Sequence, residues 1–553
     1  MKTVVCIFIL FSITLSSWAL EILNGPRTMA EWEELDGILI AWDRLEDNRD
    51  IQVPLIEHAS QEVKVYLVCN DSLNVEYHLN PQKANMKNIV LLYENYNSIW
   101  CRDYGPWTVY RNLADSLSFV DWIYEWNFDD RIPAKLSLYF QIPSFEFSKD
   151  PYKLYFSGGN FMVDGHGTGF ASRELLYSNI TRNEGDIDAM FDTFMGVKRF
   201  IKLETLPDDP LNHIDMYMKL LDEETLLVGE FPEFVESSKI INRNIAYIQQ
   251  NFGTCFGRPY KIVRIPMAPF ATGSYFGTDG QFQSYTNSLI VNKTVIVPTY
   301  NHALDAVALD IYREAMPGYN VVGINCETII HHQGAIHCIT KEIGAREPIF
   351  ISHAKLQDQS GAVAGYPVQA VVKSRNFIVD VAAFYRTSPT GPFRRLTMKS
   401  QGQEDYAALI PAQPPGSTVE YYVQAMDVND KTIRKPLVAP QGFWTFDVDM
   451  TTQVAAQPLP VQEFELLANY PNPFNSSTLL SFVLPSQEFV SLHIFDINGR
   501  LVRNVAHQEY AAGQHAVIWD GTDDANVSVG SGTYFYKLQA GDEVKQGRMS
   551  LLK

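Results

Sequence analysis

Short apolar runs alternate with amphipathic stretches along residues 21–342, and this alternation predicts the elements of a first domain. Short continuous apolar runs are typical of buried strands, whereas a 3.6-residue period is typical of helices. We expect strands at 37–42, 63–68, 90–93, 153–156, 225–228, 289–291 and 295–297, helices at 51–61 and 305–315, and a final strand after 320–323 that ends at Cys338. This order predicts an α/β domain over residues 20–346, with polar residues collected at strand edges.

The pattern changes near Glu347. Residues 368–372, 379–385 and 419–425 alternate between apolar and polar side chains, and Pro and Gly turns separate them. Short alternating strands of this kind predict an immunoglobulin-like β-sandwich over residues 347–448.

Two further segments follow the predicted sandwich. Residues 449–463 are rich in Gln, Ala and Pro, which predicts a linker. Residues 464–553 return to strand-like patterns and predict another small β-sandwich.

The first residues have the pattern of a secretory signal peptide over 1–19. Lys2 supplies the positive charge, residues 4–15 form the apolar core, and 16–19 form an exit of mostly small residues. The apolar core is too short for a confident membrane span. Cys6 lies inside this core rather than after it, which argues against a lipoprotein.

Composition and charge exclude some classes of protein. With 46% hydrophobic residues the chain has enough apolar side chains for packed cores, so global disorder is excluded. The formal net charge of −20 argues against a general nucleic-acid binder, which would carry a basic face. These values suit a soluble secreted protein.

Cys338, within the segment 334–340, is the candidate nucleophile. The chain has 6 cysteines, and removing Cys6 with the leader leaves an odd number, so at least one thiol stays unpaired unless chains cross-link. A lone cysteine is usually an inert core residue. Here, however, residues 100–107, 157–160 and 213–215 supply the polar groups that a reactive thiol needs.

These groups together suit chemistry on a guanidinium. Carboxylates such as Asp103 and Asp215 match the planar fork of guanidinium N–H donors bidentately. A Cys338 thiolate could attack the central carbon, and His213 could protonate the departing ammonia and then activate water. Two carboxylates near a thiol oppose thiolate formation, so we expect a bound cationic substrate to favour it.

Each group alone also has an ordinary structural explanation. Asp103 could pair with Arg102 or cap a turn, and the ends of 213–215 could simply share one face of a strand. Residues 158–159 could form a tight turn, and Asn287 could be a turn residue before a strand. The joint occurrence of these groups favours a site.

Two rival interpretations remain open. A zinc site could be built from His331, His332, His337 and Cys338, but their spacing matches no standard zinc pattern. A non-catalytic surface protein that keeps the fold is the second rival, and the intact set of candidate groups argues against it.

Four motifs carry a resemblance to a known family. They are Trp100-x-Arg102-Asp103-x-Gly105-Pro106, Gly158-Gly159-Asn160 with Asp164-Gly165-x-Gly167-Thr168, His213-x-Asp215 and Ile336-His337-Cys338. Over residues 28–345 the chain resembles the agmatine deiminase and Porphyromonas-type peptidylarginine deiminase family. This resemblance implies a five-bladed α/β propeller, the pentein fold of guanidine-modifying enzymes. It also implies hydrolysis of a guanidinium to a ureido group with release of ammonia, without a metal or other cofactor.

The resemblance also implies roles for individual residues. Cys338 becomes the nucleophile, His213 the general acid and base, and Asp103 and Asp215 the guanidinium ligands. Asn287 resembles the active-site asparagine of the peptidylarginine branch. The implied substrate-binding residues are Trp100, Asp103, Gly159, Asp215 and Arg131.

The substrate itself is left open between an arginine in a peptide and agmatine, which would give N-carbamoylputrescine. Ser157 and Asn160 around the double glycine favour the peptidylarginine branch. Residues 124–131, however, lack the Arg-Pro-Arg sequence with which that branch reads a terminal carboxylate, and only Arg131 could replace it. The acidic residues of this stretch are Glu125, Asp129 and Asp130. They predict weak binding of a substrate carboxylate.

The tail carries a second resemblance. Residues 469–475, 492–500, 519–521 and 532–538 resemble a type IX secretion sorting domain, with a generic adhesion-like sandwich as the alternative. The resemblance implies recognition by the type IX secretion machinery, export through the periplasm and outer membrane, and a secreted or cell-surface location.

Overall fold

The computed structural model describes residues 25–43, 48–277, 279–360, 365–402, 404–449, 464–466, 469, 474, 478–510, 513–525, 527–541 and 543–551. The chain divides into two compact units, residues 1–450 and 451–553. The predicted signal peptide at 1–19 lies outside the described residues, as does the predicted linker apart from Asp449. No described helix is long and apolar enough to cross a membrane.

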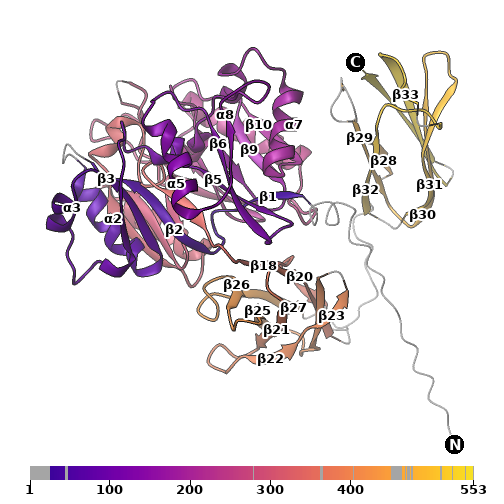
Figure 1. Cartoon of the computed structure of the whole chain (residues 1–553). Coiled ribbons are helices and arrows are strands. Elements are labelled where there is room, and N and C mark those ends of the chain that lie inside the picture. Colours follow the sequence, from indigo (N-terminus) through magenta and orange to yellow (C-terminus); the bar gives the residue numbers. More distant parts are fainter. Residues whose placement is uncertain are drawn as a thin grey trace, which may run out of the picture. The chain divides into compact units, whose positions relative to one another are not determined.

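Within the described residues, five separate sheets build the first part of the first unit (Figure 1). The first sheet contains β1 (Pro26–Thr28), β5 (Trp107–Arg111), β6 (Ser116–Trp122) and β7 (Ser144–Phe147), and the second contains β2 (Leu35–Ala41), β3 (Lys64–Cys69), β4 (Ile89–Tyr93) and β17 (Lys341–Gly344). The third contains β8 (Met162–Val163), β9 (Thr168–Ser172) and β10 (Arg199–Leu203), and the fourth contains β11 (Met218–Asp222), β12 (Thr225–Glu230) and β13 (Lys261–Pro266). The fifth contains β14 (Leu289–Val291), β15 (Thr294–Thr299) and β16 (Asn320–Asn325).

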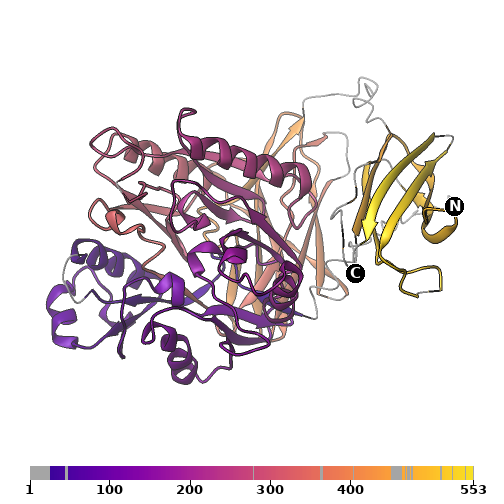
Figure 2. The ribbon, with the colours of Figure 1, turned by 90° about the horizontal axis from the view of Figure 1, so that it is seen from above.

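Helices connect these strands and lie on the outside of the sheets in both views (Figures 1 and 2). The longer ones are α2 (Arg49–Glu62), α3 (Ser72–His78), α5 (Ile132–Phe140), α7 (Glu184–Met195), α8 (Glu236–Asn251) and α9 (Leu304–Ala315). In α8 the buried side chains recur every three to four residues, as in Ile241, Ile245 and Ile248, so one face packs on the sheets.

The last strand of this region returns to its beginning. β17 pairs antiparallel with β2, with Lys341 opposite Leu39 and Ile343 opposite Gly37. Because β17 begins soon after Cys338 and runs antiparallel to β2, this pairing brings the Cys338 segment to the carboxyl end of β2. The site described below depends on this return.

Most of the elements predicted from the apolar pattern are confirmed. β2, α2, β3, β4, β12 and α9 coincide with predicted elements within a few residues. β14 and β15 form the predicted hairpin, in which Val291 pairs with Thr294 across a turn at Asn292, whose φ is 47°. Asn and Gly are the usual residues at such left-handed positions.

Two predicted strands are wrong. Residues 153–156 form no strand, and only Tyr155 makes an isolated bridge, with Ile123. Cys338 also does not end a strand, because residues 329–332 form the 3-10 helix η5 (Ile329–His332) and 336–339 form a turn. The N–H groups of Ala335 and His337 bond to the side chain of Asn287, so they are not available to a sheet.

A β-sandwich follows within the same unit (Figure 1). Its sheets consist of β18 (Ile349–Ser352), β20 (Gly365–Ser374), β24 (Asp405–Pro411) and β23 (Lys399–Gly402), and of β19 (Gln359–Ser360), β27 (Trp444–Asp449), β25 (Thr418–Asp427), β21 (Ile378–Arg386), β22 (Arg394–Thr397) and β26 (Thr432–Lys435). The strands predicted at 368–372, 379–385 and 419–425 lie inside β20, β21 and β25. Their inward side chains share one apolar core.

The second unit is a smaller β structure with its own core. Its described strands are β28 (Glu465–Leu466), β29 (Thr478–Leu484) and β32 (Gly513–Trp519) in one sheet, and β31 (Leu501–Tyr510), β30 (Glu488–Phe495), β33 (Gly532–Ala540) and β34 (Glu543–Leu551) in the other. Trp519 is fully buried in this core.

Candidate active site

Cys338 lies in a turn that the side chain of Asn287 holds in place. The Oδ1 atom of Asn287 accepts hydrogen bonds from the N–H groups of Ala335 and His337, both at 3.1 Å. Its Nδ2 atom lies 3.1 Å from the Cys338 sulfur. Asn287 therefore fixes the turn and also supplies an N–H donor to the thiol. Both Asn287 and Cys338 are buried.

The ring of Trp100 lies against the same turn. A β-carbon placed on Gly334 would lie 2.6 Å from Trp100 Cζ3 and 3.0 Å from the Cys338 sulfur. Only glycine therefore fits between the indole and the thiol. The structure thus places Trp100, one of the predicted substrate-binding residues, beside the candidate nucleophile.

Asp215 stands next to the thiol with one oxygen left without a partner. It lies in the 3-10 helix η4 (Ile214–Met216) rather than on a strand, so a shared strand face does not explain the His213–Asp215 spacing. Its Oδ2 accepts from Asn287 Nδ2 at 3.1 Å and lies 3.6 Å from the Cys338 sulfur. Its Oδ1 is buried without a hydrogen-bond partner in the described structure. Buried acceptors are rarely left unpaired, so this oxygen is suited to a ligand's N–H.

Asp103 is also available to a ligand. It lies on the short helix α4 (Cys101–Tyr104), and the expected alternative of a salt bridge to Arg102 is wrong. Arg102 instead donates to both oxygens of Glu342, at 2.7 and 2.6 Å. Asp103 Oδ1 accepts the Gly159 N–H at 3.2 Å and lies 3.8 Å from His213 Nδ1.

Gly159 is the point around which the polar groups meet. It belongs to η3 (Gly158–Asn160), the tight turn expected from the double glycine. A β-carbon here would lie 2.6 Å from His213 Nδ1, 3.2 Å from Asp215 Oδ2 and 3.3 Å from Asp103 Oδ1. The missing side chain therefore leaves the space that a planar cation between two carboxylates would need.

Burial and neighbouring negative charges both raise the pKa values of Asp103 and Cys338. Burial raises the pKa of Asp103, the Asp215 carboxylate raises it further, and His213 acts in the opposite direction. Burial raises the pKa of the Cys338 thiol well above its ordinary value, and the charges of Asp215 and Asp103 add to this. The hydrogen bond from Asn287 only partly offsets them. A cation bound between the carboxylates would therefore favour the thiolate.

Comparisons with known proteins agree with this geometry. A model of the Porphyromonas-type peptidyl-arginine deiminase family matches residues 27–343. The chain belongs to this family. A relative from Vibrio parahaemolyticus named "Putative agmatine deiminase" is 25% identical over 358 residues, which cover 58% of this chain and 98% of the relative.

Solved structures show that the family region has the fold of known deiminases, the pentein fold. The agmatine deiminase of Enterococcus faecalis matches with a TM-score of 0.50 and 21% identity over 58% of this chain and 96% of that chain. The "Putative Arginine Deiminase from Porphyromonas gingivalis" matches with a TM-score of 0.51 and 22% identity over 57% and 98%. In the tail, residues 473–543 match a model of the FlgD Ig-like domain.

The deiminase-family region holds its site with a buried network that the sequence did not reveal. His337 Nδ1 lies 2.7 Å from Asp215 Oδ2, and His337 Nε2 lies 2.8 Å from Glu31 Oε1. Glu31 Oε2 accepts from Lys219 Nζ at 2.5 Å. Each ring nitrogen of His337 therefore lies within hydrogen-bond distance of a different carboxylate. Through its Nδ1, His337 orients the Asp215 carboxylate.

The zinc alternative is not supported by this arrangement. Both nitrogens of His337 contact carboxylates, whereas His331 is exposed and stacks on Phe270 with ring centroids 5.5 Å apart. Within the described residues, the one group of possible metal ligands consists of Glu31, His337 and Glu342. Lys219 and Arg102 already pair with its carboxylates, so we assign an ion-pair network there.

Arg131 is not brought to the thiol by any contact among the described residues. It is exposed at the end of η2 (Asp129–Arg131). Two of the acidic residues of this stretch bond to backbone N–H groups. Asp129 is fully buried and accepts the N–H of Asn97 at 2.6 Å, and Asp130 accepts the N–H of Tyr124 at 2.7 Å. Both carboxylates hold the loop itself.

We predict that removing the charge of Asp103 makes the Cys338 thiol ionise more easily but lowers the rate of turnover. Replacing Asp103 by asparagine removes a charge that raises the pKa of Cys338. In the free protein we therefore expect the pH midpoint of Cys338 alkylation by iodoacetamide to move to lower pH. Turnover should fall by about 100-fold or more, because the guanidinium loses a charged partner.

The measurement is the alkylation rate against pH, with the modified cysteine identified by mass spectrometry. Asp310→Asn, an exposed acid in α9, is the matched control and should change neither quantity. An alkylation midpoint for Asp103→Asn that equals the wild-type value would contradict the assigned electrostatics.

Proposed function

We propose that the chain hydrolyses a guanidinium group to a ureido group and releases ammonia, with Cys338 as the covalent nucleophile. The observation that carries this proposal is the unpartnered Oδ1 of Asp215, whose other oxygen lies 3.6 Å from the thiol and borders the space at Gly159 together with Asp103 and His213. Family membership supports the same reaction. A purely binding surface protein would not need a thiol, an imidazole and two carboxylates at one point.

Binding comes first in this mechanism. The guanidinium donates its N–H groups to Asp215 Oδ1 and to the free side of Asp103, and the Trp100 ring covers the Cys338 side of the space. The positive charge of the substrate lowers the cost of ionising Cys338 between two carboxylates. The thiol therefore ionises when the substrate is present, which protects the free protein from side reactions.

The first chemical step forms a carbon–sulfur bond. The Cys338 thiolate attacks the central guanidinium carbon, and one C–N bond breaks as His213 gives a proton to the departing nitrogen. Ammonia leaves, and the product is an S-alkyl thiouronium on Cys338. Asn287, whose Nδ2 lies 3.1 Å from the sulfur, stabilises the negative sulfur before attack.

The second step reverses the roles. Water enters where ammonia left, His213 takes its proton, and the resulting hydroxide attacks the same carbon. The carbon–sulfur bond breaks, the Cys338 thiolate is released, and the second proton of the water passes through solvent to the released ammonia, which becomes ammonium, as the ureido carbonyl forms. The proton that His213 gives to the departing nitrogen is the one that the Cys338 thiol lost, so the net reaction converts a guanidinium and water into a ureido group and ammonium.

We propose a substrate that carries an uncharged or cationic group distal to its guanidinium: internal arginine in a peptide, or agmatine, which would give N-carbamoylputrescine. Arg131 is the single cation of its loop, and no second arginine stands beside it. Absence of a bidentate cationic partner commonly costs a carboxylate about 2–5 kcal/mol. We therefore expect the kcat/KM for peptides with C-terminal arginine to exceed that for agmatine or internal arginine by no more than about tenfold.

The measurement is release of ammonia and of the ureido product from agmatine, free arginine, internal-arginine peptides and C-terminal-arginine peptides. A chelator should leave all rates unchanged; inhibition that zinc reverses would support the metal alternative. A large preference for C-terminal arginine that Arg131→Ala removes would show that this loop reads a carboxylate. No ammonia from any of these guanidinium compounds would overturn the proposed reaction.

The arrangement of the sheets is also a proposal at the level of the whole domain. We propose that the sheets of residues 26–344 are the blades of a five-bladed propeller around the space at Gly159. The residues at that space come from α4, η3 and η4 and from the turn before β17, which lie in different parts of this region. A convergent site of this kind is expected when successive blades each present one loop to a common axis.

We further propose that residues 1–19 direct secretion and that residues 464–553 act as a type IX sorting domain, which places the protein at the cell surface or outside the cell. Support comes from the leader pattern and the four tail segments. A protein that ends at Asp449 should keep its kcat/KM within about a factor of two, because residues 451–553 form a separate compact unit that contains none of the site residues. It should also fail to reach the surface.

That prediction is checked by assaying the purified truncation and by cell fractionation with surface labelling. A control that removes only residues 552–553 separates the effect of tail length from loss of the β unit. Loss of turnover in a folded truncation would show that the boundary is misplaced, and normal export would argue against a sorting role.

A further inference from the structure

A second cavity, of about 350 Å³, lies where the β-sandwich of residues 349–449 meets the deiminase-family region of the same unit. None of the residues that line it belongs to the site around Cys338. Its walls come from the segment before β2, the turn after β8, the β11–β12 hairpin, the end of α9, and the sandwich. Pockets of this volume hold small organic molecules.

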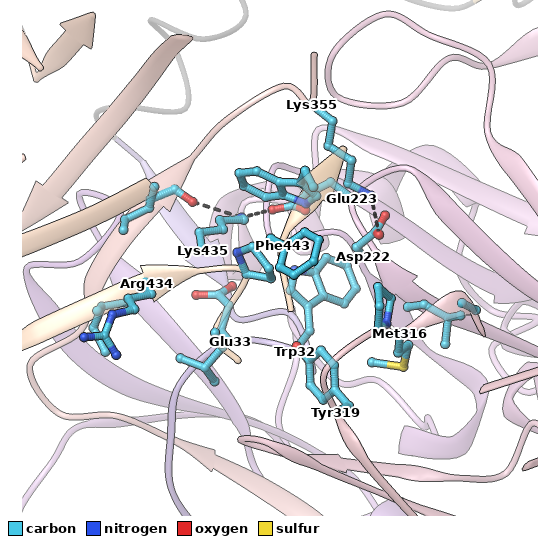
Figure 3. A pocket seen from close by; sticks show the side chains of 18 of the residues that line it. Trp32, Glu33, Asp222, Glu223, Met316, Tyr319, Lys355, Arg434, Lys435 and Phe443 are labelled. Carbon is cyan, nitrogen blue, oxygen red and sulfur yellow. Dashed lines mark hydrogen bonds and ion pairs between the residues drawn. The ribbon is translucent and has the colours of Figure 1, made fainter. Parts of the chain in front are cut away.

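One wall of the cavity is apolar and largely aromatic. Figure 3 shows Trp32, Tyr319 and Met316 close together, with Phe443 of the sandwich in front of them. Aromatic faces pack against apolar groups and also attract cations through the negative face of the ring. This wall therefore suits the body of a ligand that combines apolar carbon with positive charge.

Two of the four Lys and Arg side chains that line the cavity pair with acids of the protein. Lys355 Nζ bonds Asp222 at 2.5 Å, and Lys435 pairs with Glu223 while also donating to the Ile351 carbonyl at 2.9 Å (Figure 3). These pairs join the sandwich to the β11–β12 hairpin. Acids outnumber bases in the lining, which has Glu33, Glu34, Asp164, Asp222, Glu223 and Glu314 against Lys261, Lys355, Arg434 and Lys435.

Asp164, another acid in the lining, has one carboxylate oxygen without a partner in the described structure. It is 1% exposed, and its Oδ1 accepts the N–H groups of His166 at 2.7 Å and Thr168 at 2.9 Å. Its Oδ2 is buried and has no hydrogen-bond partner in the described structure, although Asp164 lines the cavity. Leaving a buried carboxylate oxygen unpaired is costly. A donor from a bound ligand would remove this cost.

The groups near Asp164 favour a cationic donor over a neutral or anionic one. His166, also in the lining, has its Nε2 3.6 Å from Glu223 Oε1, and its ring lies 5.4 Å from that of Phe350. Glu33 lies beside the same turn, since a β-carbon on Gly165 would be 2.9 Å from its Oε1. Because Glu33 already pairs with Arg27 and Glu223 with Lys435, the Asp164 carboxylate is the charge that would repel an anion and attract a cation.

We propose that this cavity binds a small organic cation, an alkylammonium or guanidinium with an apolar body, whose charged head bonds Asp164. The apolar body would lie against Trp32, Tyr319 and Phe443. The proposal does not depend on the reaction at Cys338. It assigns the sandwich a role beyond support, because Phe443 and the partners of Asp222 and Glu223 come from it.

The test is isothermal titration of the full-length protein with 2-phenylethylammonium, and with 2-phenylethanol as the neutral analogue. We expect one binding event that Asp164→Asn and Ala315→Trp each weaken at least tenfold. The first removes the charge with little change of shape, and the second fills the cavity from the end of α9. The neutral analogue should also bind at least tenfold more weakly.

Two controls make the test specific. Asp186→Asn makes the same chemical change at an exposed position in α7 and should leave binding unchanged. Asp103→Asn, in the other site, should also leave it unchanged. No binding of 2-phenylethylammonium at millimolar concentration, or binding that only Asp103→Asn removes, would overturn the proposal. Because Ala315→Trp does not touch Asp164, a folding defect of Asp164→Asn would not hide the answer.

Discussion

Replacing Cys338 by alanine is expected to abolish turnover of every guanidinium substrate while the protein stays folded. No other group in the site can form the covalent intermediate, so the loss should be about 10⁴-fold or more, as for other nucleophiles that act within a catalytic set. The side chain contributes little to the fold, because Asn287 holds the turn through its Oδ1 and the N–H groups of Ala335 and His337. Ammonia release and circular dichroism measure the two expectations.

A second buried cysteine provides the matched control. Cys69, at the end of β3, is fully buried in the same apolar cluster but outside the site. Cys69→Ala should lower the free energy of unfolding by leaving a small cavity, with unchanged turnover. If Cys338→Ala kept wild-type turnover, the assignment of the nucleophile would be wrong. If both variants lost turnover equally, the cause would be a folding defect.

The apolar pattern was sufficient where local sequence decides the structure. The continuous runs that became β2 and β3, and the helical period between them that became α2, are buried on one or both faces and need no distant partner to be identified. The Cys338 turn is different. Its N–H groups bond to a side chain 48 and 50 residues away, and nothing in the segment 334–340 indicates this.

The same distinction applies to the site. The motifs predicted Cys338, His213, Asp103, Asp215 and Asn287, and the structure brings these five together, with Trp100 and Gly159 beside them. Arg131 was inferred only by replacing a missing motif, and no hydrogen bond or ion pair among the described residues joins it to these five. The roles of the assembled residues remain predictions that the substitutions above test.

The buried network of His337, Glu31 and Lys219 could not be predicted from the sequence, because its members are far apart along the chain. His337 and Glu31 are 306 residues apart, and Lys219 and Glu31 are 188 apart. Charged residues outside a motif are usually solvated surface groups, so Glu31 and Lys219 carried no signal by themselves. Only the position of His337 next to Cys338 could have drawn attention to it. These contacts exist only in the folded chain, where segments far apart in the sequence meet.

The largest effect on stability is expected from Glu31→Gln. Burial would raise the pKa of Glu31, yet the positive charges of His337, Lys219 and Arg102 hold it well below its usual value. A carboxyl group with a depressed pKa stabilises the folded state above its unfolded-state pKa, and this contribution is lost as the pH falls through the folded-state value. At neutral pH the contribution is therefore fully present in the native protein.

Glutamine at position 31 leaves Lys219, which is 2% exposed, as a buried cation without its partner. Breaking a buried pair in this way costs about 3–5 kcal/mol of the free energy of unfolding. Lys219→Met in the same protein removes the stranded charge, so the double variant Glu31→Gln/Lys219→Met should recover most of that loss. Urea unfolding at neutral pH measures both values, and a single variant as stable as the wild type would contradict the pairing.

Turnover separates the positioning role of this network from its contribution to stability. In the stable double variant His337 still lacks the carboxylate at its Nε2, so it orients Asp215 less firmly through its Nδ1. A small misplacement of a group that binds the substrate costs about 100-fold in rate, and we expect kcat to fall by that order with a smaller change in KM. Lys219→Met alone, which keeps the contact between His337 and Glu31, should lose less. If the double variant regained wild-type stability and wild-type kcat together, the network would be a support of the fold alone, and Asp215 would need no partner behind it.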